Sequence, residues 1–304
     1  MRTLIRRVRQ GVQAFATALA CIVACIVACG ATVEARAAVA LYEATVPLQG
    51  ATAEARAAGM AEALRAVAVR ASGRRDAATN PTIGAASPER YVQRYSTTAG
   101  RMLKVGFDGP AIERLLQQAG LPLWPAERPR IVIDAPVADR AAVESVALWR
   151  GLTVDWAAGA PPPARGRAVL SGVPGGGDFA WTFAHEDRTT GMRGSPEAAI
   201  HFVADTLAAR YAPASTRSTS DLTVRVDGMV GLAEYAGLLA YLGGLSLVRD
   251  VEVDSLDGTL ITLRVAVRGD RELLGRIVAL DGRLQPVAPV AGDATPAVDF
   301  VYSP

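Results

Sequence analysis

The sequence predicts an α+β protein that carries small ferredoxin-like (β-α-β-β-α-β) modules at both ends and an irregular αβ region between them. Two observations lead to this fold class. Segments with apolar residues at helical spacing alternate with segments in which every second residue is apolar, and the order β-α-β-β-α-β occurs twice. Glycines, prolines and polar pairs such as Asn-Pro and Asp-Gly separate these segments, as expected of turns.

Residues 1–37 predict an export signal whose fate the sequence leaves open. Four of the first nine residues are arginine, and an uncharged, mostly apolar run follows. An A-x-A site ends at Ala37, so we expect cleavage between Ala37 and Ala38. Alternatively, Cys25 or Cys29, each at the end of an Ile-Val-Ala-Cys repeat, becomes a lipidated first residue. The third alternative is an uncleaved membrane anchor.

Each of these fates places the rest of the chain outside the cytoplasm, and we expect a periplasmic protein, with a membrane-anchored lipoprotein as the alternative. Residues 1–37 hold five arginines and one glutamate, so cleavage would leave 27 basic and 29 acidic residues. This balance argues against nucleic acid as a partner, because phosphate binding needs a concentrated basic face. The cysteines have apolar neighbours that offer no second shell of polar groups, so we expect no metal site there.

The N-terminal module is expected over residues 38–135. Its elements are, in order, a strand over 41–48, a helix over 51–72, a hairpin of strands 90–98 and 101–108, a helix over 109–119 and a strand over 128–136. The first helix has one apolar stripe, formed by Met60, Leu64, Val67 and Ala71. Gly73 is expected to end this helix, and Asp108 to cap the second one.

The middle region, residues 136–213, is less regular. Its expected elements are a helix over 141–149, a strand over 151–156, a hairpin of strands 167–173 and 178–185, and a helix over 196–211. Three consecutive prolines, 161–163, interrupt this order. A polar linker follows the last helix.

The C-terminal module is expected over residues 219–290 and repeats the pattern of the first. Its elements are a strand over 222–228, a helix over 232–242, a hairpin over 248–269 around an Asp-Gly turn, a helix over 271–278 and a strand over 282–288. One face of the second hairpin strand is apolar and the other polar, which predicts a sheet covered on one side. Residues 291–304 are expected to form a loose tail.

Several phrases of the chain resemble a known family. They are LYEATVPL, AVAVRASG, YVQRYS, LKVGFD and LLQQAGLPLWPAERP, within residues 40–160, and YAGLLAYLGGLSLVRDVEV near the C-terminus. The chain resembles the exported bacterial family catalogued as domain of unknown function 2066. The resemblance implies an envelope location and the domain plan given above. It implies no catalytic residue, ligand or partner.

The two histidines, His185 and His201, limit the catalytic chemistry that the chain can support. His185 is followed by Glu186 and Asp187, but the segment is not a H-E-x-x-H metal motif, so we expect a solvated loop. His201 lies beside the apolar stripe of its helix and is expected at the surface. Ser171 lacks the strand, sharp turn and helix of a nucleophile elbow. We therefore assign no catalytic, cofactor-binding or metal-binding residue.

Trp124 stands between prolines with Arg128 close by, and two interpretations are open. An exposed tryptophan and arginine could recognise an extended peptide or a glycan. More often, such a tryptophan fills the gap between a helix end and a strand, because tryptophan usually buries most of its area. We favour the second interpretation.

The function expected from these patterns is that of a non-enzymatic scaffold or adaptor of the cell envelope, which presents sheet faces and edges to another envelope protein. The alternative is a small-molecule or glycan binding module built on the middle region. A hydrolase that uses His185, with Ser171 and Asp187, ranks third. No cofactor is expected, and contact with a membrane is expected only through an uncleaved signal or a lipid anchor.

Overall fold

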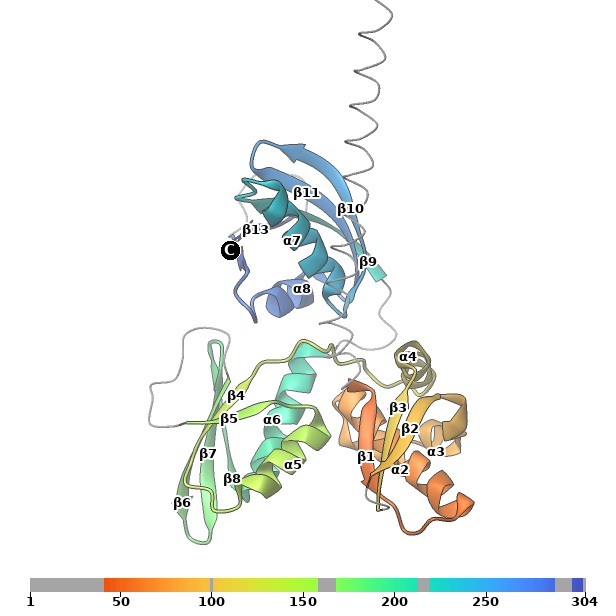
Figure 1. The fold of residues 1–304 in the computed structure, drawn as a ribbon. Helices are drawn as coiled ribbons and strands as arrows, with labels where there is room; N and C mark the ends of the chain where they lie inside the picture. The colour runs from red at the N-terminus through yellow and green to blue at the C-terminus, as the bar shows by residue number, and fades with distance from the viewer. Residues whose placement is uncertain (1–40, 99–100, 158–167, 213–218, 288–296, 303–304) are drawn as a thin grey trace, which may run out of the picture.

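The computed structural model describes residues 41–98, 101–157, 168–212, 219–287 and 297–302, which form three αβ units (Figure 1). Within these ranges the chain has three sheets and seven α-helices, so the predicted α+β class is confirmed. No helix in the same ranges has the length and apolar character needed to cross a membrane. The predicted signal and its Cys25, Cys29, Ala37 and Ala38 sites lie outside the described residues.

The N-terminal unit packs helices on one three-stranded antiparallel sheet of order β1-β3-β2. Its main elements are β1 (Glu43–Pro47), α2 (Ala53–Ser72), β2 (Val92–Thr98), β3 (Met102–Phe107) and α4 (Gly109–Gln118). Short helices η1 (Arg75–Thr79), α3 (Pro81–Ala85) and η2 (Pro88–Arg90) connect α2 to β2. The predicted stripe of α2 is buried, Gly73 ends the helix with a φ of 73°, and the Asp108 side chain caps α4.

The fourth strand predicted for this module lies in a different sheet, so the ferredoxin-like arrangement is not confirmed here. This strand, β4 (Ile131–Asp134), lies between β5 (Val154–Trp156) and β6 (Ala168–Gly175) and runs parallel to both. Its three apolar residues are all buried, and such a strand suits the interior of a sheet covered on both faces. As a consequence, β1 remains an edge strand of the N-terminal sheet.

The middle unit is built on the five-stranded sheet β5-β4-β6-β7-β8. Its remaining elements are α5 (Arg140–Arg150), β7 (Asp178–His185), β8 (Arg188–Gly194) and α6 (Pro196–Tyr211). The hairpin of β6 and β7 is the predicted one. The segment after His185, predicted as a loop, is a two-residue turn that leads directly into β8.

The C-terminal unit has the sheet order β10-β11-β9-β13-β12. Its elements are β9 (Thr219–Asp227), α7 (Leu232–Gly244), β10 (Val248–Asp257), β11 (Leu260–Arg268), α8 (Arg271–Val278), β12 (Leu284–Pro286) and β13 (Ala297–Tyr302). β13, which belongs to the predicted loose tail, pairs with β9 in place of β12. Buried Phe300 and the Asp299–Arg225 ion pair hold it there. Because β13 separates β9 from β12, the ferredoxin-like arrangement is not confirmed here either.

Two hydrophobic clusters form the core of the described chain. One belongs to the N-terminal unit and extends from Ala44 to Leu123. The other runs without interruption from Trp124 through the middle and C-terminal units to Phe300. The segments predicted as separate modules, 136–213 and 219–290, therefore share one cluster.

Candidate functional site

The outer edge of β1 is open, and the hydrogen bonds around the strand show which backbone groups face outward. Tyr42 O accepts a hydrogen bond from β3 at 3.0 Å, and Leu48 N donates to the residue before β3 at 2.7 Å. An antiparallel strand bonds to a given neighbour at every second residue, so the even-numbered residues of β1 face β3. Thr45 therefore directs its N–H and C=O away from the sheet. Neither group bonds to another residue of the described ranges.

A groove of about 650 Å³ runs along this edge, between the N-terminal and middle units. Figure 1 shows β1 as the strand of its sheet that faces α5. The groove is lined by β1 itself, by α2 and by Ser145, Leu148 and Trp149 of α5. Leu148 is 67% exposed, although it lies beside a tightly packed helix junction. The groove thus combines open strand backbone with an exposed apolar side chain.

Charged groups border the groove on the sheet side. Glu43 forms ion pairs with Lys104, at 3.0 Å, and with Arg94. The Arg70 guanidinium donates to the Glu43 carbonyl, which is the other outward-facing carbonyl near Thr45. Burial opposes ionisation of Glu43, but its hydrogen bonds to Arg94 and Lys104 hold the pKa of this carboxyl below its ordinary value. The Glu43 carboxylate is therefore ionised and already bonded to Arg94 and Lys104. The backbone N–H and C=O of Thr45 remain the open polar groups of the strand.

Arg128 and Trp124 stabilise the junction between the units and are not available for recognition. Trp124 is 2% exposed, and the Arg128 guanidinium lies 3.9 Å from the centre of its ring. Arg128 donates to Gly151 O and to Arg70 O, both at 2.8 Å, at the C-terminal ends of α5 and α2. Burial lowers the pKa of Arg128 to about 9, so the group stays protonated at neutral pH. Trp124 is therefore not the exposed residue that the recognition interpretation required.

Arg150, which the sequence analysis did not single out, completes this junction. Its side chain is fully buried and donates to Gly73 O and to Asp205, both at 2.7 Å. His201 was expected at the surface, but it is half-buried and its Nδ1 lies 3.2 Å from the Arg150 guanidinium. The ring of His201 meets Trp149 edge-on, with centroids 5.9 Å apart. Both contacts come from α5, so the apolar pattern of α6 alone could not place His201.

His185 is buried, so the prediction of a solvated loop is wrong. It is the last residue of β7, and its Nε2 lies 2.8 Å from the hydroxyl of Tyr211 on α6. The Tyr211 hydroxyl donates to Glu186 at 2.8 Å. Desolvation, followed by the nearby charge of Arg210, lowers the pKa of His185 to about 4. The strand ladder places Ser171 opposite Thr182, three residues before His185 in β7, so the residues of the hydrolase hypothesis do not form a hydrogen-bonded set.

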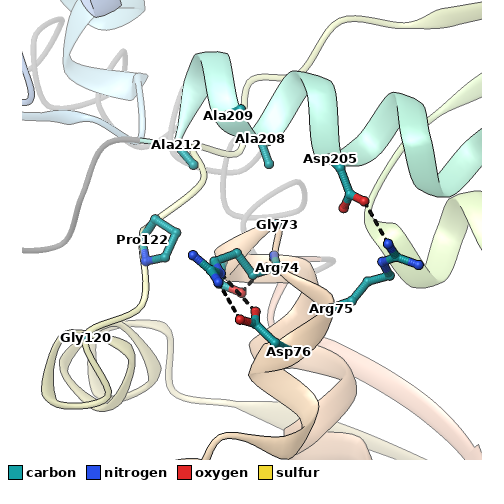
Figure 2. Close-up of a pocket in the computed structure, with 11 residues that line it drawn as sticks. Gly73, Arg74, Arg75, Asp76, Gly120, Pro122, Asp205, Ala208, Ala209 and Ala212 are labelled. Carbon is teal, nitrogen blue, oxygen red and sulfur yellow. Dashed lines mark hydrogen bonds and ion pairs between the residues drawn. The ribbon is translucent and has the colours of Figure 1, made fainter. Parts of the chain in front are cut away.

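A second hollow, of about 840 Å³, lies where the end of α2 meets α6 (Figure 2). Its charged side chains are already paired, because Arg74 bonds to Asp76 and Arg75 bonds to Asp205 at 3.1 Å. Figure 2 shows both ion pairs on the wall of the hollow, with small alanine side chains of α6 opposite. The paired charges leave little for a ligand to bind, so we assign no function to this hollow.

Comparison with known proteins identifies the part of the chain that carries the open edge. Residues 35–125 match the family described as Domain of unknown function (DUF8605). The resemblance to domain of unknown function 2066 is therefore corrected. No curated protein and no solved structure matches the chain.

The DUF8605 match covers the whole N-terminal unit and ends just before β4. One wall of the groove, formed by β1 and α2, thus lies inside the DUF8605 segment, and the other wall, α5, lies outside it. The apolar pattern of α5 contained a sequence signal for that second wall, namely an apolar residue outside the buried stripe. Val143, Ala147 and Arg150 of α5 are buried on one face, and Leu148 falls outside their helical stripe.

Proposed function

We propose that this chain is an exported cell-envelope protein, a non-enzymatic adaptor that binds an extended segment of another envelope protein along β1. The observation that carries the proposal is the open backbone of Thr45 on the β1 wall of the groove. The predicted export signal of residues 1–37 supports the envelope location. The DUF8605 segment would supply the strand edge, and α5 would supply the apolar contact.

The proposed occupant is an extended peptide because strand addition satisfies both backbone groups of Thr45 at once. β1 has five residues and so offers an edge of roughly 17 Å at the usual rise per residue. The bound segment would place an apolar side chain against Leu148 and Trp149. Specificity would come from that contact, whereas the backbone bonds would accept many sequences.

β10, the longest of the other edge strands in the described ranges, is a weaker candidate. Its ten residues include two register shifts, and bulges of this kind disturb pairing with a further strand. Four exposed acidic side chains, Asp250, Glu252, Asp254 and Asp257, also lie along it. Bulges and charges are the devices by which proteins protect sheet edges from association. The edge of β1, in contrast to that of β10, is bordered by a groove that a peptide can enter.

The first step of the test identifies the partner. A photoreactive residue replaces Leu148 in the full chain expressed in its own host, and the crosslinked peptide is identified by mass spectrometry. The control position is Val173, which is similarly exposed but lies on the β6–β7 hairpin. We expect one extended segment of an envelope protein to be joined at position 148 and not at position 173.

The second step tests the edge itself with a synthetic peptide of that segment. Thr45→Pro removes the outward N–H, and proline is tolerated on an edge strand. Thr97→Pro is the matched control, because Thr97 is the outward-facing exposed threonine on the opposite edge strand, β2. We expect Thr45→Pro to weaken peptide binding at least about tenfold, or about 1.4 kcal/mol, and Thr97→Pro to leave it unchanged. Equal binding by both variants would refute strand addition at β1.

A further inference from the structure

We propose that the exposed apolar surface at the start of α7 is a second docking site, which binds a basic amphipathic helix of a partner protein. The site, here called the α7 patch, consists of Val230, Leu232, Val253 and Leu256. It belongs to the C-terminal unit, shares no residue with the β1 groove, and does not depend on peptide binding there. A chain with both sites would join two partners.

α7 lacks the polar face of an ordinary surface helix. Glu234 is the only charged residue among its thirteen, yet only Leu238 and Leu242 are buried. Leu232, in its first turn, is 69% exposed. A surface helix normally carries charged and polar residues on the side away from the core, and a helix that is apolar all round is normally covered. The sequence of α7 is therefore that of a helix with a further covering.

The loop before α7 extends the exposed apolar surface toward the end of the β10–β11 hairpin. Met229 N donates to Thr259 O at 3.0 Å, so this loop lies against the turn of the hairpin. Figure 1 shows the start of α7 near the same turn. Val230, the next residue of the loop, is 84% exposed. The start of α7 and the end of the hairpin thus form one surface.

β10 supplies the other half of the α7 patch. Val253 and Leu256 pair in register with Leu263 and Ile261, which are buried in the same cluster as the inner side of α7. Residues opposite each other in a strand pair point to the same face, so Val253 and Leu256 lie on the face that α7 covers. Both are nevertheless exposed. Exposed apolar residues that gather in one place mark interaction sites.

Acidic residues border the α7 patch. Residues 227–244 and 250–264 contain six carboxylates and one arginine. That arginine, Arg264, already pairs with Glu252 at 3.3 Å and with Asp254 at 3.0 Å. A complementary partner therefore carries lysine or arginine around its apolar residues. The six carboxylates are those of Asp227, Glu234, Asp250, Glu252, Asp254 and Asp257.

The same features select a helix of another protein as the occupant. The register shifts and charges of β10 oppose the addition of a strand, so the partner binds through its side chains, as a helix does. A second copy of this chain would bring two acidic borders together, and like charges across an interface are unfavourable. An anionic lipid surface would be repelled for the same reason.

The test uses a fluorescent amphipathic helical peptide of leucine and lysine, titrated with the full chain and followed by anisotropy. We expect saturable binding, and no binding of the matched peptide in which glutamate replaces lysine. Leu232→Ser and Leu256→Ser should each lower the affinity at least about tenfold, because each removes a buried apolar contact. Val173→Ser is the control, since Val173 is 69% exposed on the distant β6–β7 hairpin, and it should bind as the wild type does.

Glu234→Gln tests the acidic border separately. It should weaken binding of the leucine–lysine peptide about two- to fivefold, which is the effect of one exposed ion pair. Glu89→Gln, in the N-terminal unit, removes the same charge far from α7 in the sequence and should have no effect. Equal affinities for these two variants would show that charge does not select the partner.

Three results would overturn the proposal. The first is equal affinity for the Leu232, Leu256 and Val173 variants, whose exposed positions should let all of them fold with the wild-type melting temperature. The second and third are binding of the full chain to phosphatidylcholine vesicles, or its self-association in sedimentation, that Leu232→Ser abolishes, because the patch would then have a different occupant. Failure of peptide binding at β1 would leave the α7 patch standing, because the two sites share no residue.

Discussion

His185 is held as a neutral imidazole by the residues around it. Since the Tyr211 proton is donated to Glu186, the Nε2 of His185 must carry the proton that bonds to the tyrosine oxygen. Its Nδ1 is buried without a partner among the described residues. Protonation would add a charge in that buried position, next to the positive charge of Arg210.

The first prediction concerns the pH dependence of stability. The pKa of His185 is about 4 in the folded chain and about 6.5 when unfolded, so between these values the unfolded chain binds more protons. The contribution of His185 is therefore complete above pH 6.5 and is lost as the pH falls toward 4. It amounts to about 3 kcal/mol at most. Urea denaturation of the wild type and of His185→Gln should show a stability difference that shrinks between pH 7 and pH 4.5. A constant difference would contradict this account.

The second prediction concerns Arg128, whose planar guanidinium joins the ends of two helices. Lysine keeps the charge but has a single nitrogen in place of the separate Nη1 and Nη2 atoms that donate to Gly151 O and Arg70 O. We expect Arg128→Lys to lower the free energy of unfolding by about 2 to 3 kcal/mol. Arg130→Lys is the control, because Arg130 forms an exposed ion pair with Asp155 and should lose less than about 1 kcal/mol. Guanidinium denaturation measures both, and similar losses would show that Arg128 has no special role.

At the scale of the elements, the end of α2 is the point where the N-terminal and middle units come closest. Gly73 has a φ of 73°, and a Cβ atom there would lie 2.4 Å from the Cβ of Ala208 and 2.7 Å from Trp124. Position 73 thus requires glycine for two reasons: the helix ends there with a positive φ, and the interface has no room for a Cβ atom. Gly120, after α4, has a similar φ of 67°, but a Cβ atom added to it would have no other atom within 4 Å.

The third prediction compares these two glycines. Gly120→Ala should cost about 1 kcal/mol, which is the cost of the left-handed backbone alone. Gly73→Ala should cost more, by about 1 to 3 kcal/mol, because the added methyl group also overpacks the interface. Thermal and urea denaturation of both variants give the comparison. Equal costs would mean that the junction adjusts to the methyl group without strain.

The sequence analysis missed two strands of the described ranges, β8 and β13. β8 has the sequence RTTGMRG and is mostly exposed, so no alternation of apolar residues marks it. It becomes a strand because the turn after His185 brings it alongside β7, with which all seven of its residues pair. β13 is likewise a strand through its pairing with β9 and β12.

At the scale of the whole molecule, the tail has a structural role that its sequence did not indicate. Phe300 of β13 is 1% exposed and belongs to the cluster shared by the middle and C-terminal units. β13 also separates β9 from β12 in the sheet, so its removal would leave β12 without a neighbour and open one edge of β9. The C-terminal unit should therefore need the tail in order to fold.

The fourth prediction tests this with two fragments. Residues 219–304 should give a cooperative thermal transition and dispersed amide signals, whereas residues 219–290 should give neither. Phe300→Ala in the longer fragment should cost about 3 to 5 kcal/mol. Val301→Ala is the control, because Val301 is exposed and its truncation should have little effect. Cooperative folding of the shorter fragment would show that β13 is dispensable.

The sequence by itself determined the local elements of this protein. Apolar stripes, caps such as Asp108 and stops such as Gly73 act within one helix, so residues close in the chain are enough to specify them. The β2–β3, β6–β7 and β10–β11 hairpins are local for the same reason. These features gave the correct α+β class and most of the elements.

Only the tertiary structure decided which strand pairs with which sheet and which polar side chains are buried. An apolar strand such as β4 can pair with any suitable edge, and the choice depends on packing against residues far away in the chain. Its place in the middle sheet opens the β1 edge at Thr45. In the same way, His185 is buried by Tyr211, which lies 26 residues further along. The open edge at Thr45 and the burial of His185 both arise from such distant contacts, and local patterns cannot specify them.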